Sequence, residues 1–172
     1  MGTDYAESNV GFVWHHSIYG GPPQVIERYC LISQTLKNGQ VVGCTYTGGS
    51  VRAAADADTS LFGVMTHNLT TTATEKGTMA SVIPFAPGYV WEVKAAAGMV
   101  GGSPISYLGH YVDLIQNTTY RSRVDTAGTT KLFQVIGYNP EDAGRTNAGN
   151  RLWVMLLDGK NQLGGMLPPG IA

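Results

Sequence analysis

The histidine pair His15-His16 is the first place to look for metal chemistry, because neutral imidazole is a common ligand of zinc. Adjacent residues of an extended chain point to opposite sides, so this pair is not expected to chelate one ion. His67 and His110 are isolated, and the sequence has no HxxxH, HExxH or CxxC spacing. We therefore expect no metal site and no cofactor.

Carboxylates and glycines also fail to form a recognisable reactive motif. Asp56–Ser60 resembles part of a calcium loop, but the required Gly and the bidentate Glu are missing. Asn139–Asp142 is typical of a turn, in which two carboxylates could hold a cation only weakly. Gly98–Ser103 lacks the Lys-Ser/Thr ending of a phosphate loop, and no G-x-S-x-G occurs. The sequence favours a non-enzymatic protein; a catalytic centre assembled from distant residues is the alternative.

The two cysteines, Cys30 and Cys44, are interpreted as buried small apolar residues. Asn38-Gly39 is the strongest hairpin signal in the chain and predicts a type I′ turn. That register would set Lys37 opposite Gln40, Cys30 opposite Thr47 and Cys44 opposite Ser33. The two thiols would not meet, so no disulfide is expected.

Composition narrows the class of protein. Only 13% of the 172 residues are charged and the net charge is −1, which provides no field for binding nucleic acid or a membrane surface. No apolar run is long enough for a transmembrane helix, and the N-terminus lacks the features of a secretory signal. A surface poor in charge suits tight protein–protein contact.

Glycine makes up 23 of the 172 residues and interrupts nearly every possible helix, so the chain is expected to be all-β. Tyr89–Ala95 alternates with a period of two, which predicts one buried and one solvated face. Four further runs are continuously apolar, as in central strands: Leu61–His67, Met79–Phe85, Lys131–Tyr138 and Arg151–Leu157. On these patterns Trp91 and Trp153 are expected in the core, unlike Trp14.

One internal echo occurs between the two halves of the chain. Leu61–Val64 and Asn68 recur at a constant offset as Leu132–Val135 and Asn139. Gly77 and Val82 recur at a slightly longer offset, as Gly149 and Val154. Two similar hairpins in one sandwich would explain the echo, and chance similarity between strands is the alternative.

The two ends differ from the middle, because both are extended in character and carry large apolar groups. We expect an N-terminal arm over residues 1–24, a single β-sandwich or β-barrel-like core over 25–160, and a C-terminal tail over 161–172. The arms are predicted to pack on neighbouring subunits. The predicted contact residues are Val10, Phe12, Trp14, Tyr19, Met166, Leu167, Pro168 and Ile171.

The order of these features resembles that of the capsid decoration (cement) proteins of tailed bacteriophages. The segments that carry the resemblance, from about residue 10 to 157, are Gly11-Phe12, Gly20–Pro22, Glu27–Ile32, Asn38–Gly43, Ala55–Asp58 with Leu61–Val64, Leu108–Leu114, Val124–Ala127, Phe133–Tyr138 and Arg151–Leu157. Pro23-Gln24 departs from the family, where relatives more often place Trp and another Gly.

The resemblance implies a structural virion protein on the outside of an icosahedral phage head. It would be made in the host cytoplasm, self-associate as a homotrimer and clamp neighbouring major capsid proteins. It implies no active site. The alternatives are a carbohydrate- or receptor-binding β-module of a phage tail, which should present clustered surface aromatics beside carboxylates, and a small hydrolase on a jelly roll.

Overall fold

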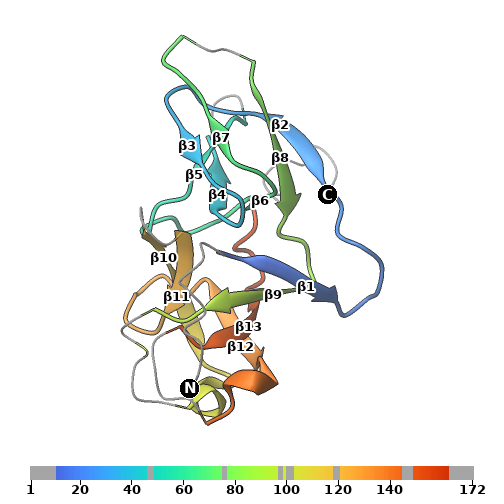
Figure 1. Ribbon diagram of the computed structural model, residues 1–172, viewed down its shortest axis with the longest axis vertical. Coiled ribbons are helices and arrows are strands. Elements are labelled where there is room, and N and C mark those ends of the chain that lie inside the picture. Colours follow the sequence, from blue (N-terminus) through green and yellow to red (C-terminus); the bar gives the residue numbers. More distant parts are fainter. Residues whose placement is uncertain are drawn as a thin grey trace, which may run out of the picture.

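The fold was analysed in a computed structural model, which describes residues 11–45, 49–74, 77–96, 99, 103–117, 121–144 and 149–162. The chain is nearly all β, and antiparallel sheets pack together into a sandwich-like domain (Figure 1). The expected all-β class is confirmed. Among the described residues, helix is limited to short 3₁₀ segments such as η2 (Pro104–Tyr107) and η3 (Pro140–Asp142).

The first large sheet has five strands in the order β2-β8-β6-β4-β5. Their bounds are β2 (Ile26–Tyr29), β4 (Val41–Cys44), β5 (Val51–Ala53), β6 (Gly63–Met65) and β8 (Met79–Pro84). A separate two-stranded sheet joins β3 (Thr35–Leu36) to β7 (Leu69–Thr70). These strands form the upper part of Figure 1.

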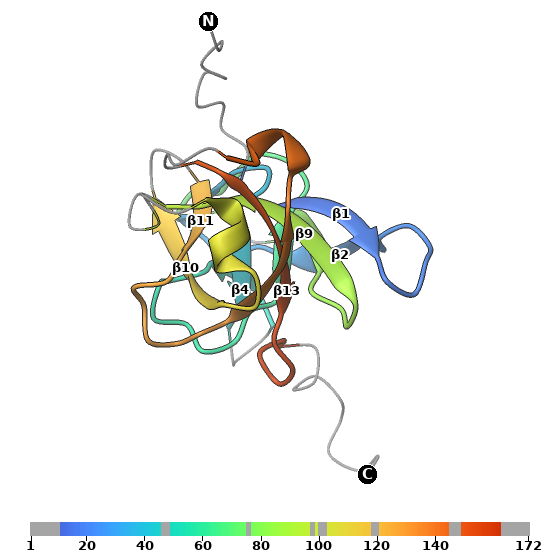
Figure 2. The same cartoon turned by 90° about the horizontal axis from the view of Figure 1, so that it is seen from below.

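The second large sheet has six strands in the order β1-β9-β13-β12-β10-β11, and it forms the lower part of Figure 1. Their bounds are β1 (Val13–Ser17), β9 (Tyr89–Lys94), β10 (Tyr111–Asn117), β11 (Arg121–Asp125), β12 (Phe133–Tyr138) and β13 (Arg151–Leu156). Figure 2, seen from below, shows η2 lying in front of this sheet.

The two sheets share one topology. In chain order, β2, β4, β5, β6 and β8 (unit 1) correspond to β9, β10, β11, β12 and β13 (unit 2), and both sets are arranged first-fifth-fourth-second-third. Each unit also curls so that a parallel bridge joins the end of its first strand to its third strand. The bridges are Cys30 to Val51 in unit 1 and Ala95 to Val124 in unit 2. The strand β1 is extra: it covers the edge of β9, whereas the corresponding edge of β2 has no neighbouring strand among the described residues.

Equivalent hydrogen bonds support this duplication. In unit 1, Gly39 N donates to Met65 O and Met65 N donates to Gln40 O. In unit 2 the same pair of bonds recurs, from Gly109 N to Val135 O and from Val135 N to His110 O. Gly39 and Gly109 both have φ of +80°, a left-handed conformation that favours glycine. The likeness therefore extends to single backbone groups.

The sequence similarity between the two halves falls on the strands of this duplication. In the first of these strands, however, the sequence alignment is shifted by a single residue from the structural correspondence. Two similar hairpins exist, because β6 pairs with β8 and β12 pairs with β13. Phe62 N donates to Val42 O, and Leu132 N donates to Val112 O, so Leu132 corresponds to Phe62 and not to Leu61. The match of Val82 with Val154 does agree, because these residues face Ile26 and Trp91 on the first strand of each unit.

The predicted hairpin at Asn38-Gly39 is wrong, although the turn exists. Gln40 N donates to Lys37 O at 3.0 Å, but only Gly39 has a positive φ, as in a type II turn and not a type I′ turn. The chain then diverges, because β3 pairs with β7 while β4 pairs with β5 and β6. Both cysteines are buried and free, as expected, with Val51 between their strands.

Two apolar clusters form the core. The smaller one lies inside unit 1, and the larger one fills unit 2 and extends to the junction between the units. At this junction Phe12 packs edge-on against Phe85, with ring centroids 6.1 Å apart, and also contacts Trp91 and Phe133. The ring cluster joins residues from both units, so it ties the two sheets together.

Candidate interaction surface

The structure corrects part of the expected N-terminal arm. Phe12 is only 2% exposed in the core, and Trp14 lies in β1 opposite Trp91. These two side chains therefore pack within their own chain, because pairing of β1 with β9 buries apolar groups that a free arm would expose. Tyr19 is 78% exposed and stays available to a partner. Val10, Met166, Leu167, Pro168 and Ile171 lie outside the described residues.

The connection from β1 to β2 and the outer face of β2 and β8 carry several exposed apolar side chains, which are grouped here under the name β2 surface. Tyr29 lies directly opposite Met79, so both side chains are on one face of the sheet. The exposed apolar members of the β2 surface are Ile18, Tyr19, Val25, Tyr29 and Met79. Beside them, one edge of β2 has no neighbouring strand in the described part of the chain, and such an edge can accept another strand.

A second exposed apolar surface, named here the unit 2 face, lies on η2, β10 and β12. Its large apolar members are Ile105, Leu108, Tyr111 and Ile136. Tyr111 stands opposite Gln134, and Gly109 N donates to Val135 O, which brings the turn after η2 beside β12. The strands of the β2 surface thus belong to unit 1, and the unit 2 face belongs to unit 2.

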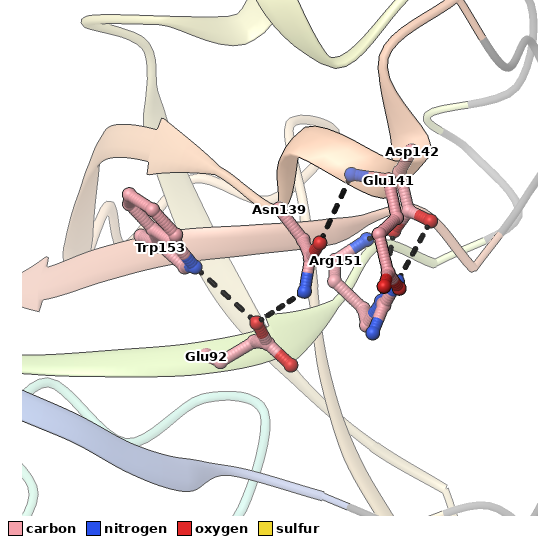
Figure 3. A network of polar contacts seen from close by, with 6 residues as sticks. All are labelled: Glu92, Asn139, Glu141, Asp142, Arg151 and Trp153. Atoms are coloured by element: carbon pink, nitrogen blue, oxygen red, sulfur yellow. Dashed lines mark hydrogen bonds and ion pairs between the residues drawn. The ribbon is translucent and has the colours of Figure 1, made fainter.

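A polar network covers the rest of the outer face of the six-stranded sheet (Figure 3). Asp142 is 1% exposed and binds Arg151 through Nε at 3.0 Å and Nη2 at 3.1 Å. Glu141 also accepts from Arg151, at 2.8 Å. These carboxylates raise the pKa of the Arg151 guanidinium above its ordinary value, and the main cause is the hydrogen bond that Arg151 donates to Asp142. The two carboxylates and the Arg151 guanidinium thus serve as hydrogen-bond partners for one another, and this network stabilises the turn at η3.

Trp153 belongs to this outer face, so its expected core position is wrong. Its neighbours Leu152 and Val154 are fully buried, and the alternation of β13 turns Trp153 outward. Its Nε1 donates to Glu92 at 3.2 Å, and His15 stacks on its ring with centroids 4.5 Å apart. Gly137 lies against the ring on the neighbouring strand. The indole is therefore partly covered by its own chain.

The two adjacent histidines meet, against expectation. A bulge in β1 between Trp14 and His16 interrupts the alternation, and the Nδ1 atoms of His15 and His16 hydrogen-bond to each other. One ring nitrogen donates this bond and the other accepts it. No cluster of three or more His, Cys, Asp or Glu residues that could hold a metal occurs in the described part of the chain.

Cys44 is the thiol with the most perturbed environment. Burial raises its pKa to about 11, against the opposing charges of Arg28 and Arg52. The thiolate needed for nucleophilic or redox chemistry is therefore disfavoured at neutral pH.

Sequence reasoning missed the unit 2 face. Ile136 lies in the predicted apolar run Lys131–Tyr138, and alternation from the buried Phe133 and Val135 places it outside. Leu108 and Tyr111 lie in none of the predicted runs. Of the β2 surface, Tyr19 was a predicted contact, but Met79 was missed because it starts a run whose buried members, Ala80 and Val82, face the other way.

No known protein family matches this chain, and no curated protein has a significantly similar sequence. No helix in the part of the chain that the structure describes is long and apolar enough to cross a membrane.

Proposed function

We propose that this chain is a structural virion protein that decorates the outside of an icosahedral phage head and clamps neighbouring major capsid proteins. The β2 surface is the contact with the capsid. The protein acts by binding, without catalysis or a cofactor. The proposal combines the order of sequence features that resembles decoration proteins with the exposed apolar surface that the fold presents.

The β2 surface is the observation that carries the proposal. Tyr29, Val25 and Tyr19 are each more than half exposed on a chain with only 13% charged residues. Large aromatic groups supply much of the binding energy at protein interfaces, and charged residues are depleted at interface cores.

The free edge of β2 gives this surface a second way to bind. In unit 2 the equivalent edge, on β9, pairs with β1 through Val13 to Ser17. An extended segment of a capsid protein could pair with β2 in the same way, with backbone hydrogen bonds for affinity and side-chain contacts for specificity. Glu27 and Arg28 are exposed on this strand and would restrict which segments fit.

The test is binding to phage heads stripped of their decoration protein. The full chain should pellet with the heads, whereas Tyr29→Asp combined with Met79→Asp should lose binding at least tenfold, because two charges would be placed in an apolar contact. Thr74→Asp, an exposed site outside the β2 surface, is the control for added charge. Both variants are first checked for native melting temperature.

Two results would contradict the proposal. Failure of the wild-type chain to bind any stripped head would remove the capsid function itself. Equal coating by the double variant would keep the function but move the contact elsewhere. The alternative of a glycan-binding module gains no support from Trp153 and Glu92, because these two side chains already bond to each other and His15 and Gly137 lie against the indole ring.

A further inference from the structure

The junction between the two units shows how one unit packs on the other. Val41, Val64 and Ile83 are cross-strand neighbours on β4, β6 and β8, and together they form a row on the outer face of unit 1. Val41 and Val64 are buried, and all three pack into the cluster that fills unit 2. Val41 also donates to Ser122 Oγ and accepts from Gln116 Nε2, both at 2.8 Å. The outer row of unit 1 is therefore a docking face that is already occupied.

Unit 2 carries the same row at equivalent positions. Tyr111, Gln134 and Met155 are cross-strand neighbours on β10, β12 and β13, the strands that correspond to β4, β6 and β8 of unit 1. Yet Tyr111 is 52% exposed where its counterpart Val41 is fully buried. The unit 2 face surrounds this row with Ile105, Leu108 and Ile136, which are also exposed. Unit 2 thus presents, uncovered, the face that unit 1 uses to pack.

We propose that a second copy of this chain docks on the unit 2 face, in head-to-tail order. Within one chain the row of unit 1 occupies a receiving surface on unit 2. The row that remains is on unit 2, and the receiving surface that remains is on unit 1, so the next unit in the series is unit 1 of another copy. The interface is continuous with the packing already present inside the chain.

The chemistry of the face fits such a partner. The row contains an aromatic, an amide and a thioether side chain and no charge, so it can be buried without an ion-pair partner. A head-to-tail contact is heterologous, and copies joined in this way close into a ring if the rotation allows it. A ring of three copies would contain six similar units. This inference concerns self-association and does not depend on the capsid function proposed above.

Sedimentation velocity over micromolar to near-millimolar concentrations tests the inference. The wild-type chain should self-associate, and Ile136→Asp should weaken the association at least tenfold, because a charge would be buried without a partner. Ile18→Asp is the matched control, since it places the same charge at an exposed apolar position on the connection from β1 to β2, which belongs to neither unit. Gln134→Glu is a milder second variant in case Ile136→Asp fails to keep a native melting temperature. A wild-type chain that stays monomeric throughout, or a control that is weakened as much as Ile136→Asp, would overturn the inference.

A cysteine variant tests the head-to-tail order. Gln134→Cys, in a chain whose Cys30 and Cys44 are replaced by Ala, should not form a disulfide-linked dimer efficiently, because position 134 would face unit 1 of its neighbour. Efficient symmetric cross-linking would show a face-to-face contact and reject the order. Pelleting with stripped heads separates the two proposals: Ile136→Asp that associates normally yet no longer coats heads would make the unit 2 face a capsid contact and reject self-docking.

Discussion

At the scale of single residues, Trp91 and Trp153 of the second sheet have different roles. Trp91 is 1% exposed among the aromatic rings of the junction, whereas Trp153 lies on the outer face. We expect Trp91→Ala to lower the free energy of unfolding by about 3–5 kcal/mol, the usual cost of truncating a buried tryptophan. Trp153→Ala should cost less, because part of its side chain already contacts solvent. Urea unfolding of both variants measures the difference, and the opposite ranking would show that the outer face is the better packed one.

Gly137 allows Trp153 to lie flat over its neighbouring strand. A Cβ atom at position 137 would stand 2.5 Å from Cε3 of Trp153 and force the indole to move. We expect Gly137→Ala to destabilise the fold by about 1–3 kcal/mol, as overpacking does. Gly43→Ala is the matched control, because its Cβ would meet other atoms only at 3.5 Å or more. Thermal melts of the two variants should separate clearly; equal melting temperatures would contradict the packing of this pair.

Cys44 gives the fold a dependence on alkaline pH. In the unfolded chain its thiol ionises near its ordinary pKa of 9.0, while burial raises the folded pKa to about 11. The unfolded state therefore loses its proton first, and the contribution of Cys44 to stability is lost as pH rises from 9 to 11. Replacing it by Ala should flatten the decline of unfolding free energy across this range. If the unfolding free energy of the variant falls as steeply as that of the wild type, the decline is caused by other groups.

At the scale of elements, the strands were more predictable than their connections. The alternation of Tyr89–Ala95 and the apolar runs at Met79–Phe85 and Arg151–Leu157 coincide with strands, because burial of one or both faces leaves a direct periodic signal. The turn at Asn38-Gly39 was located but misassigned. Whether this turn closes a hairpin depends on the strands with which its flanking residues pair. Leu36 pairs with Leu69, which is distant in sequence, so no local pattern reveals the contact.

The strand β1 belongs to the folded core, which changes the expected effect of truncation. The sequence predicted an arm over residues 1–24, but removing residues 1–20 would remove the buried Phe12 and uncover the edge of β9. We expect removal of residues 1–10 to leave the melting temperature nearly unchanged and removal of 1–17 to lower it by many degrees. Phe12 alone accounts for about 3–5 kcal/mol of the latter loss. Differential scanning calorimetry distinguishes the two truncated chains. Equal melting temperatures would show that β1 does not contribute to the folded core.

At the scale of the whole molecule, the all-β class was predictable and the duplication only partly so. Gly77 and Gly149 both have a positive φ, which favours glycine in each unit. The sequence match of Gly77 and Val82 with Gly149 and Val154 therefore agrees with the structure. The rest of the likeness lies in backbone pairing, which different side chains satisfy: Val41 and Tyr111 occupy the same place with no chemical similarity. For the same reason the sequence predicted a surface suited to protein–protein contact but did not show where that surface lies.

Stability of the whole chain should not depend on metal or on a disulfide. Both cysteines are free, and a structural zinc or disulfide would contribute several kcal/mol. Neither EDTA nor a reductant should therefore move the melting temperature by more than roughly 2 °C, given that a shift of 1 kcal/mol corresponds to a few degrees at this size. A larger fall under either treatment, measured by differential scanning fluorimetry, would reveal a structural ligand or cross-link.

The pairing of β1 with β9 has a consequence for synthesis on the ribosome. β1 is made before every other strand of the two large sheets, but Val13 must wait for Glu92 before its strand can pair. At roughly 5–20 residues per second this delay is about 4–16 s. During that time Phe12 and Trp14 have no native partners on β9 or beyond, while most of unit 1 has already emerged. The nascent chain therefore passes through a stage in which its first apolar residues are open to chaperones, and the domain closes only when its second half supplies β9.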